Sequence, residues 1–369
     1  IVTTKTGNTL FFERKTGLPI YDINYKKVPQ SNVPSEFVAR KQIFIEKPER
    51  FSKIEFEIND LRDDLLSDEK YVKNFKKNSV YGYFHPPTLG KDTIMYGVVG
   101  GNNWYGSAYN PINETLFIPG SHVPFLIKVF PISKSQNLQK IANHENYPIY
   151  KDKCASCHGD YRNGVQTIDT YENKIKFIPS LVGFNIFEPI KDKMKNLNQL
   201  KEKHSNNFNI TNEELSKLNE LFLDWDNELK NENEIGFDAY YTLLTSKNNK
   251  PISKPPWGTI TSMNLSNGTI NWKVPFGYDE NENIGVVNVG GLSVSSSNLI
   301  FATGTSDNFA FVIDGDTGKE LWKFKMNAAG TTPPLIYEYK KKQYISFLST
   351  GGITNSSSRS SALYTFSLK

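Results

Sequence analysis

Residues 309–322 read FAFVIDGDTGKELW, and residues 257–272 read WGTITSMNLSNGTINW. In each copy a strand-like run is followed by a turn that holds a glycine, and then by a second run that ends in tryptophan. A weaker third copy, FFERKTG, occupies residues 11–17. Repetition of such a unit is typical of β-propeller blades, and unrelated β-hairpins are the alternative. The pattern predicts a mainly β fold in which each tryptophan packs between neighbouring blades.

The composition narrows the possible classes of protein. The chain has 369 residues, enough for two or three domains, and 13% of them are aromatic. Its formal net charge of +4 is small for this length, and no Lys/Arg stripe is present, which argues against a nucleic-acid partner. It contains no run of about 18 apolar residues, so we expect no transmembrane segment. The chain opens in a strand-like stretch without a signal peptide, which indicates a processed precursor or a missing upstream part.

A second motif, CASCHG at residues 154–159, interrupts the β pattern. The C-x-x-C-H spacing is typical of covalent c-type haem attachment, with thioether bonds from Cys154 and Cys157 and an axial nitrogen from His158. A zinc site needs four ligands, and the chain has no further cysteine pair. A thioredoxin-type redox pair would need a βαβ context, which is absent. The motif therefore predicts a haem c, and it leaves no cysteine for a structural disulfide.

Helical spacing surrounds this motif. Residues 141–153 can form a helix that leads into it, and Thr211 with Glu214 forms a capping box ahead of an amphipathic stretch. We expect propeller blades at residues 1–137, an inserted α-helical domain at 138–232, a polar linker at 233–256 and closing blades at 257–369. Strand-like runs fill 94–130, whereas 21–93 is expected to form long excursions with one short helix.

Several short segments occur in the order found in one enzyme family. They are KTGN (5–8), VPQSNVP (28–34), FHPPTL (84–89), GGNNW (100–104), AYNP (108–111), PPWG (255–258), ATGTSDN (302–308) and TPPLIY (332–337). In this order they resemble the dehydrogenases that depend on pyrroloquinoline quinone (PQQ), of the membrane glucose dehydrogenase type. The family fold is an eight-bladed β-propeller, and the chain resembles its C-terminal half, about four to five blades.

The resemblance also implies a quinone pocket. Lys5 matches a lysine beside the quinone oxygens, where an ammonium group would stabilise the oxyanion of the reduced quinol. Asn103 and Trp104 match a segment that lines the pocket, and Asp307 with Asn308 matches an inner-strand segment. Ordinary turn chemistry is the alternative for that pair, as blade packing is for Trp104. The family's catalytic base and calcium ligands come from earlier blades, so calcium is expected to be bound outside this chain.

The inserted region resembles a class I c-type cytochrome domain. Pro179, in the segment PSLVG at 179–183, matches a proline whose carbonyl orients the proximal imidazole, here that of His158. The sixth iron ligand in such domains is usually a methionine about seven residues before the residue that caps the last helix. Counting back from Thr211 gives His204, which we prefer, and Met194 is the alternative.

Together these expectations describe the haem-containing part of a quinohaemoprotein dehydrogenase. Such an enzyme would oxidise an alcohol, sugar or polyol with PQQ and pass electrons through the haem to an external acceptor such as a cytochrome. A non-catalytic electron-transfer or structural subunit is the alternative. A half propeller exposes blade edges, so we expect a polypeptide or upstream segment that completes the ring. Haem c attachment predicts a periplasmic or otherwise extracytoplasmic location.

Overall fold

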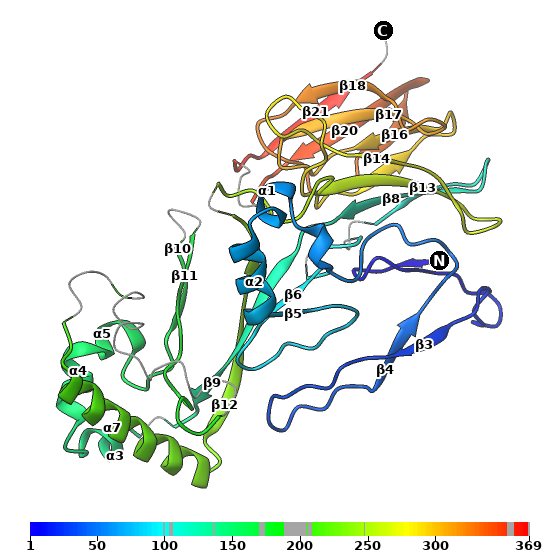
Figure 1. Ribbon diagram of the computed structural model, residues 1–369. Coiled ribbons are helices and arrows are strands. Elements are labelled where there is room, and N and C mark those ends of the chain that lie inside the picture. The colour runs from blue at the N-terminus through cyan, green and yellow to red at the C-terminus, as the bar shows by residue number, and fades with distance from the viewer. Residues whose placement is uncertain are drawn as a thin grey trace.

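The computed structural model describes residues 1–98, 100–102, 106–135, 137–169, 174–187, 204, 209–246, 248–352 and 358–367. Figure 1 shows two parts: β-sheets stacked at one end and a small group of helices at the other. The long strands β9 (Phe125–Ser133) and β12 (Ile235–Leu243) join them. Within the described part of the chain no helix is both long and apolar enough to span a membrane.

Three sheets have the antiparallel order of propeller blades. The first has the order β14-β13-β8-β7, although residues 122–257 separate β8 from β13. The second runs β15-β16-β17-β18 and the third β19-β20-β21. Their strands are β7 (Ala108–Asn110), β8 (Thr115–Ser121), β13 (Gly258–Asn264), β14 (Ile270–Pro275), β15 (Leu292–Val294), β16 (Leu299–Ala302), β17 (Phe309–Asp314), β18 (Glu320–Lys325), β19 (Leu335–Tyr339), β20 (Lys342–Ser349) and β21 (Ala362–Phe366).

The tryptophans of the repeats pack between neighbouring sheets, as predicted. The indole Nε1 of Trp272 donates to the carbonyl of Gly315, 3.1 Å away, in the turn of the next repeat. A Cβ on Gly318 in that turn would lie 2.9 Å from the Trp272 ring. Trp322 contacts Phe366 of β21 with ring centroids 5.1 Å apart. The absence of a side chain at Gly318 thus gives room for the Trp272 ring of the preceding copy.

The N-terminal elements extend this arrangement. They are β1 (Val2–Thr3), β2 (Thr9–Leu10), β3 (Asn24–Lys27), β4 (Lys41–Phe44), η1 (Ile58–Asp60), α1 (Asp63–Leu66), α2 (Glu69–Asn78), β5 (Ser79–Tyr81) and β6 (Asp92–Met95). Tyr21 follows the glycine of the weak repeat at 11–17 by four residues, and its hydroxyl would lie 3.0 Å from a Cβ on Gly268. Tyr21 therefore lies against the turn of the first complete repeat, as Trp272 lies against the turn of the second.

A fourth sheet departs from the expected blade pattern. Its order is β12-β9-β6-β5, and β5 pairs with β6 in parallel. Nine residue pairs, from Ile235↔Ser133 to Leu243↔Phe125, join β12 to β9 in a ribbon. The linker expected at 233–256 is thus replaced in large part by a strand, because its apolar residues pair along β9. Because β5, β6, β9 and β12 form this fourth sheet, the described residues contain three blade-like sheets. The sequence had predicted about four to five blades.

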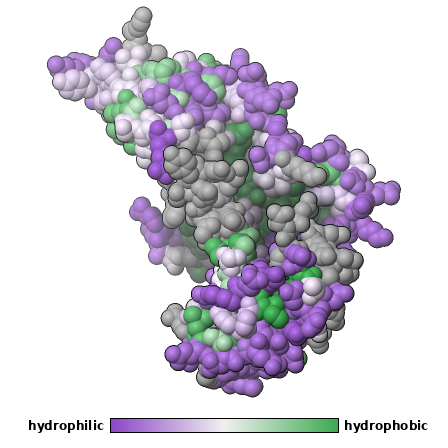
Figure 2. All heavy atoms as spheres, turned by 90° about the vertical axis from the view of Figure 1, so that its left-hand side faces the viewer, coloured by the Kyte–Doolittle hydropathy of each residue, from purple (hydrophilic) through white to green (hydrophobic). Residues whose placement is uncertain are grey.

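The helices between β9 and β12 share one apolar core, and we call this part the helical unit. Its elements are α3 (Leu138–Ala142), α4 (Tyr147–Lys153), α5 (Ala155–His158), β10 (Val165–Asp169), β11 (Lys174–Ile178) and α7 (Asn212–Asn231). The capping box of α7 is present, with Thr211 N donating to Glu214 Oε2 at 2.8 Å. The apolar face of α7 is buried against Tyr150 and Val182, and the outside of the unit is mainly hydrophilic (Figure 2).

A buried histidine joins three segments of the sheet region. His122 accepts or donates at both ring nitrogens, with Ser52 Oγ at 2.9 Å and Thr259 Oγ1 at 2.7 Å. Burial, with smaller contributions from the charges of Lys273 and Lys53, lowers the pKa of His122 to about 3. The imidazole is therefore neutral in the folded protein near neutral pH.

We expect this histidine to make the fold sensitive to acid. Between pH 6.5 and pH 3 the unfolded chain binds a proton at His122 that the folded protein does not bind, so stability falls as pH falls. From pH 7 to pH 5 the loss from this group is about 2 kcal/mol. Urea unfolding at both pH values should show a smaller loss in His122→Gln than in the unchanged protein. Equal losses would contradict the buried, neutral state.

Candidate functional site

The C-x-x-C-H segment forms one tight helical turn at the end of α4. Cys154 ends α4, and its carbonyl accepts from His158 N at 2.9 Å and from Cys157 N at 3.2 Å. Cys154 is buried and Cys157 is exposed. Burial raises the pKa of the Cys154 thiol to about 12, whereas a redox or metal-binding pair requires a thiolate. Among the described residues no group of three or more His, Cys, Asp or Glu is arranged to hold a metal ion.

The imidazole of His158 contacts the carbonyl of Pro179. The Nδ1 of His158 lies 2.8 Å from the carbonyl oxygen of Pro179. A carbonyl only accepts, so Nδ1 carries the proton and the lone pair resides on Nε2. Burial lowers the pKa of His158, and the nearby His204 lowers it further, while the bond to Pro179 opposes both. His158 is thus a neutral imidazole with Nε2 available as a ligand.

His204 lies near His158. The two ring centroids are 6.3 Å apart, and the ring planes are inclined by 47°. With metal–nitrogen bonds of about 2.0 Å and a ring centre about 1.1 Å behind each nitrogen, two axial imidazoles on one iron have centres about 6.2 Å apart. The separation therefore fits an iron between the rings. The alternative ligand, Met194, lies outside the described residues.

A buried ion pair lies behind the C-x-x-C-H segment, and its two residues are far apart in the sequence. Arg162 Nη2 lies 2.6 Å from Asp226 Oδ1, and both side chains are fully buried. The guanidinium also lies over the Trp225 ring, 4.0 Å from its centroid. The carbonyl of Arg162 accepts from Leu181 N at 2.8 Å, which fixes the loop that carries Pro179. An aspartate on the apolar face of α7 is the sequence signal that could have revealed this pair.

The segment that holds Lys5 lies against the Gly97–Gly101 loop. Lys5 Nζ donates to the carbonyl of Val98 at 3.1 Å, and its side chain is exposed. Asn102 N donates to the carbonyl of Thr4 at 3.3 Å. A Cβ on Gly101 would lie 2.2 Å from the Lys5 carbonyl oxygen, so only glycine permits this approach. Asn103 and Trp104 follow this loop directly but lie outside the described residues.

Asp307 and Asn308 have different environments. The carboxylate of Asp307 accepts from Tyr278 N at 2.6 Å and Phe309 N at 2.9 Å, so it holds its own loop and a neighbouring one together. Asn308 has a φ of 64°, and its buried Oδ1 has no hydrogen-bond partner among the described residues. Asp307 therefore has the turn role that the sequence analysis left open, whereas Asn308 offers an unsatisfied polar atom.

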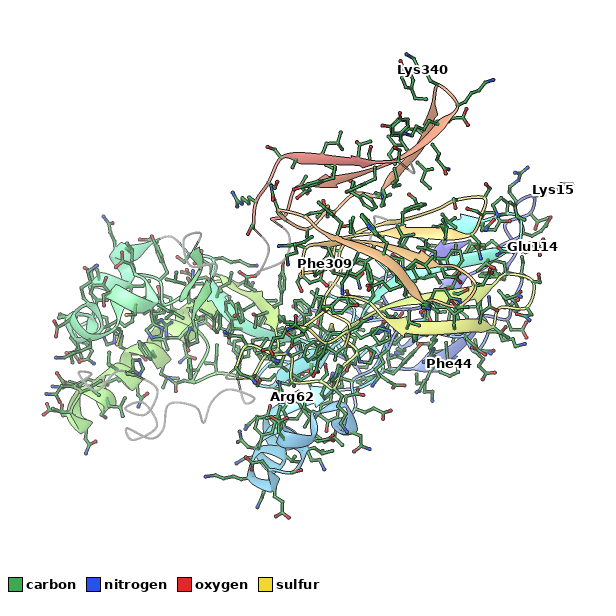
Figure 3. The ribbon with its side chains drawn as sticks, turned by 90° about the horizontal axis from the view of Figure 1, so that it is seen from above. Lys15, Phe44, Arg62, Glu114, Phe309 and Lys340 are labelled. Atoms are coloured by element: carbon green, nitrogen blue, oxygen red, sulfur yellow. The ribbon has the colours of Figure 1, made fainter. Side chains whose placement is uncertain are left out.

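A line of contacts connects these two regions. Gly101 bridges to Ser121, whose hydroxyl donates to the carbonyl of Asn288 at 2.8 Å. Asn288 bridges to Thr305, and the Thr305 hydroxyl donates to Asp307. Figure 3 shows Phe309, the next residue after Asn308, at the side of the sheets that faces the helical unit, whereas Lys15 and Glu114 mark the opposite side.

Comparison with known proteins identifies the family. The chain matches the family described as "PQQ: Glucose/ethanol/alcohol dehydrogenase, beta-propeller domain" over residues 1–204 and 185–345. The chain belongs to this family. This quinoprotein chain is 22% identical over 368 residues to quinoprotein glucose dehydrogenase A of Acinetobacter calcoaceticus, covering 95% of this chain and 36% of that protein.

Two further relatives show the same partial coverage. A probable quinate dehydrogenase (quinone) of Xanthomonas campestris pv. juglandis is 31% identical over 131 residues, which are 32% of this quinoprotein chain and 16% of that protein. The solved quinohemoprotein alcohol dehydrogenase of Comamonas testosteroni matches with a TM-score of 0.37 and 14% identity, covering 75% of this chain and 28% of that one. The chain thus spans well under two thirds of the length of these relatives.

Proposed function

We propose that this chain is the haem-containing part of a quinohaemoprotein dehydrogenase. The complete protein would oxidise an alcohol, sugar or polyol with PQQ and pass electrons through a c-type haem to an external acceptor. The single observation that carries the haem assignment is the proximity of His158 and His204, whose ring centroids are 6.3 Å apart, at the C-x-x-C-H turn with its two cysteines. Family membership supports the assignment of PQQ.

The chain's own residues have distinct roles at the proposed haem. Cys154 and Cys157 would hold it by thioether bonds, and His158 and His204 would supply the axial nitrogens. Pro179 keeps the proton of His158 on Nδ1, so that the lone pair of Nε2 would be offered to the iron. When bound, haem supplies one-electron redox chemistry, which a two-electron quinol requires in order to pass its electrons on singly.

The proposed quinone site comprises Lys5, Asn103, Trp104 and Asn308, and Asp307 holds the loop that carries Asn308. The unsatisfied Oδ1 of Asn308 supports a polar ligand at this end of the sheets. When bound, PQQ accepts two electrons from the substrate, and an ammonium such as that of Lys5 would stabilise the oxyanion of its reduced form. Calcium would be liganded outside this chain. The side of the sheets near Phe309 faces the helical unit, which is favourable for transfer to a haem there (Figure 3).

The outer face of the last sheet supports a partner that completes the propeller. Leu335, Tyr337, Leu348 and Leu363 are exposed on it, and Leu348 pairs directly with Leu363 across β20 and β21. Exposed apolar side chains on one face of a sheet are what a further blade would cover. We propose that an upstream segment or another polypeptide packs here, and the mass of the native particle tests this. A native mass equal to one copy of this chain alone would contradict it.

Covalent haem attachment would also support an extracytoplasmic location, because such attachment takes place in oxidising compartments.

The cofactor assignment is tested by extraction of the haem. Protein produced in a host that matures c-type cytochromes, denatured and treated with acidified acetone, should keep its haem and give a c-type pyridine haemochrome spectrum. Haem that passes into the acetone would exclude the thioether bonds.

The distal ligand gives a separate prediction. With His204 on the iron, the ferric protein should lack the weak long-wavelength band of thioether-ligated haem and have a lower reduction potential than a methionine-ligated one. His204→Ala should change the visible spectrum, whereas Met194→Ala should not. A thioether band that disappears in Met194→Ala would transfer the role to Met194.

A further inference from the structure

We propose that Asn163 and Phe177 are positioning residues that tie the ligand loop of His158 to the β9–β12 ribbon. They would hold the haem in one orientation relative to the propeller. The consequence for the haem rests on the proposed function, whereas the docking itself depends only on the described contacts. The helical unit would then be a fixed part of the molecule and not a tethered carrier.

Asn163 makes a two-point contact with the end of β9. Its Oδ1 accepts from Ser133 N at 2.7 Å, and its Nδ2 donates to the carbonyl of Ser133 at 3.0 Å. The amide group therefore satisfies both backbone groups of one strand residue, as a neighbouring strand would. Asn163 stands five residues after His158, so the end of β9 is joined directly to the loop that follows the haem motif.

Phe177 makes the second contact, from the hairpin formed by β10 and β11. Its ring stacks on Tyr240 of β12 with centroids 4.3 Å apart and an interplanar angle of 21°. The same ring contacts Phe130 of β9 with centroids 5.5 Å apart. Phe177 thus contacts both strands of the ribbon. It is two residues before Pro179, whose carbonyl orients His158.

The backbones at the two ends of this hairpin are in close contact. A Cβ on Gly164 would lie 2.1 Å from the Ile178 carbonyl oxygen and 2.7 Å from the Pro179 carbonyl carbon. Gly164 N donates to the carbonyl of His158 at 3.0 Å. Because these backbones are in such close contact, a shift of the hairpin on the ribbon must move the Pro179 carbonyl relative to the His158 imidazole.

The ribbon extends this fixed geometry into the sheets. Its strand β9 pairs with β6, for example at Leu126 and Ile94. Phe187 adds a further contact between the unit and the ribbon, through Phe237 of β12 with ring centroids 5.5 Å apart. Contacts at several points, and not a single tether, are what a fixed orientation requires.

The experiment compares Asn163→Ala and Phe177→Ala with the control Asn143→Ala, which removes an exposed asparagine of the same unit. Asn163→Asp, which keeps the acceptor but loses the donor, and Phe177→Tyr, which keeps the ring, are milder variants. Hydrogen exchange over residues 178–183 should accelerate about tenfold or more in the alanine variants, less in the milder ones and not in the control. Exchange indistinguishable from that of the control would overturn the docking role.

A second readout separates positioning from simple support. In haem-loaded protein, the alanine variants should change the electron paramagnetic resonance g values, which report the orientation of the axial imidazole planes, and Phe177→Tyr should restore them. Faster exchange with unchanged g values would overturn the positioning role. If the protein contains no haem, the proposed function is refuted. The hydrogen-exchange comparison would still test whether Asn163 and Phe177 dock the helical unit on the β9–β12 ribbon.

Discussion

Replacing Arg162 with leucine is expected to destabilise the helical unit by about 3–5 kcal/mol. The substitution leaves the carboxylate of Asp226 buried without its partner, because both side chains are fully buried in the intact pair. It also removes the cation–π contact with Trp225. Hydrogen exchange in α7 measures the effect, since it reports the opening of this unit separately from that of the sheets.

The double variant Arg162→Met with Asp226→Leu is the matched control. It removes both charges and fills a similar volume with apolar groups, so its cost should be much smaller than that of either single change. A single variant as stable as the unchanged protein would show that Asp226 finds another partner or is not buried in solution.

Serine at both Cys154 and Cys157 is expected to abolish covalent haem completely. An alcohol cannot form the thioether bond, so the denatured variant should carry no haem in its intact mass, whereas the unchanged protein carries one. Ser156→Ala, between the two cysteines, is the control and should keep the haem. His204→Ala should also keep it, because an axial ligand contributes to iron coordination and not to the covalent link.

Haem retained by the double serine variant would contradict the assignment of both cysteines. The side chain of Ser156 is exposed and takes no part in the proposed attachment. If Ser156→Ala also loses its haem, the loss in the double serine variant would reflect misfolding of the turn and not the missing thiols.

The repeats were predictable because their pattern is local. The tryptophan and glycine of each copy recur at fixed spacing, and Trp272 packs on the next turn as expected. The Pro179 contact with His158 was expected from the resemblance of the segment at 179–183 to a family segment. The capping box at Thr211 is likewise visible in four residues.

The ribbon was not predicted because its pairing is long-range. The apolar residues of β12 are visible in the sequence, but nothing local shows that they pair with β9 across the whole helical unit. The role of Asp307 is also set by contacts that the local sequence does not show. A carboxylate in a loop can bind a ligand or accept hydrogen bonds from its own turn. The bonds from Tyr278 N and Phe309 N favour the turn role. Arg162 was missed because its partner lies in a distant helix.

The most direct test of a quinohaemoprotein is reduction of the haem by substrate. Native protein with its complete propeller, loaded with PQQ and calcium, is mixed without an external acceptor with an alcohol, sugar or polyol that it oxidises. The account predicts that the absorption of ferrous haem c appears at the rate of substrate oxidation, and that the double serine variant shows no such signal. A haem that stays ferric while an added dye is reduced, or a protein that oxidises no such substrate, would contradict it.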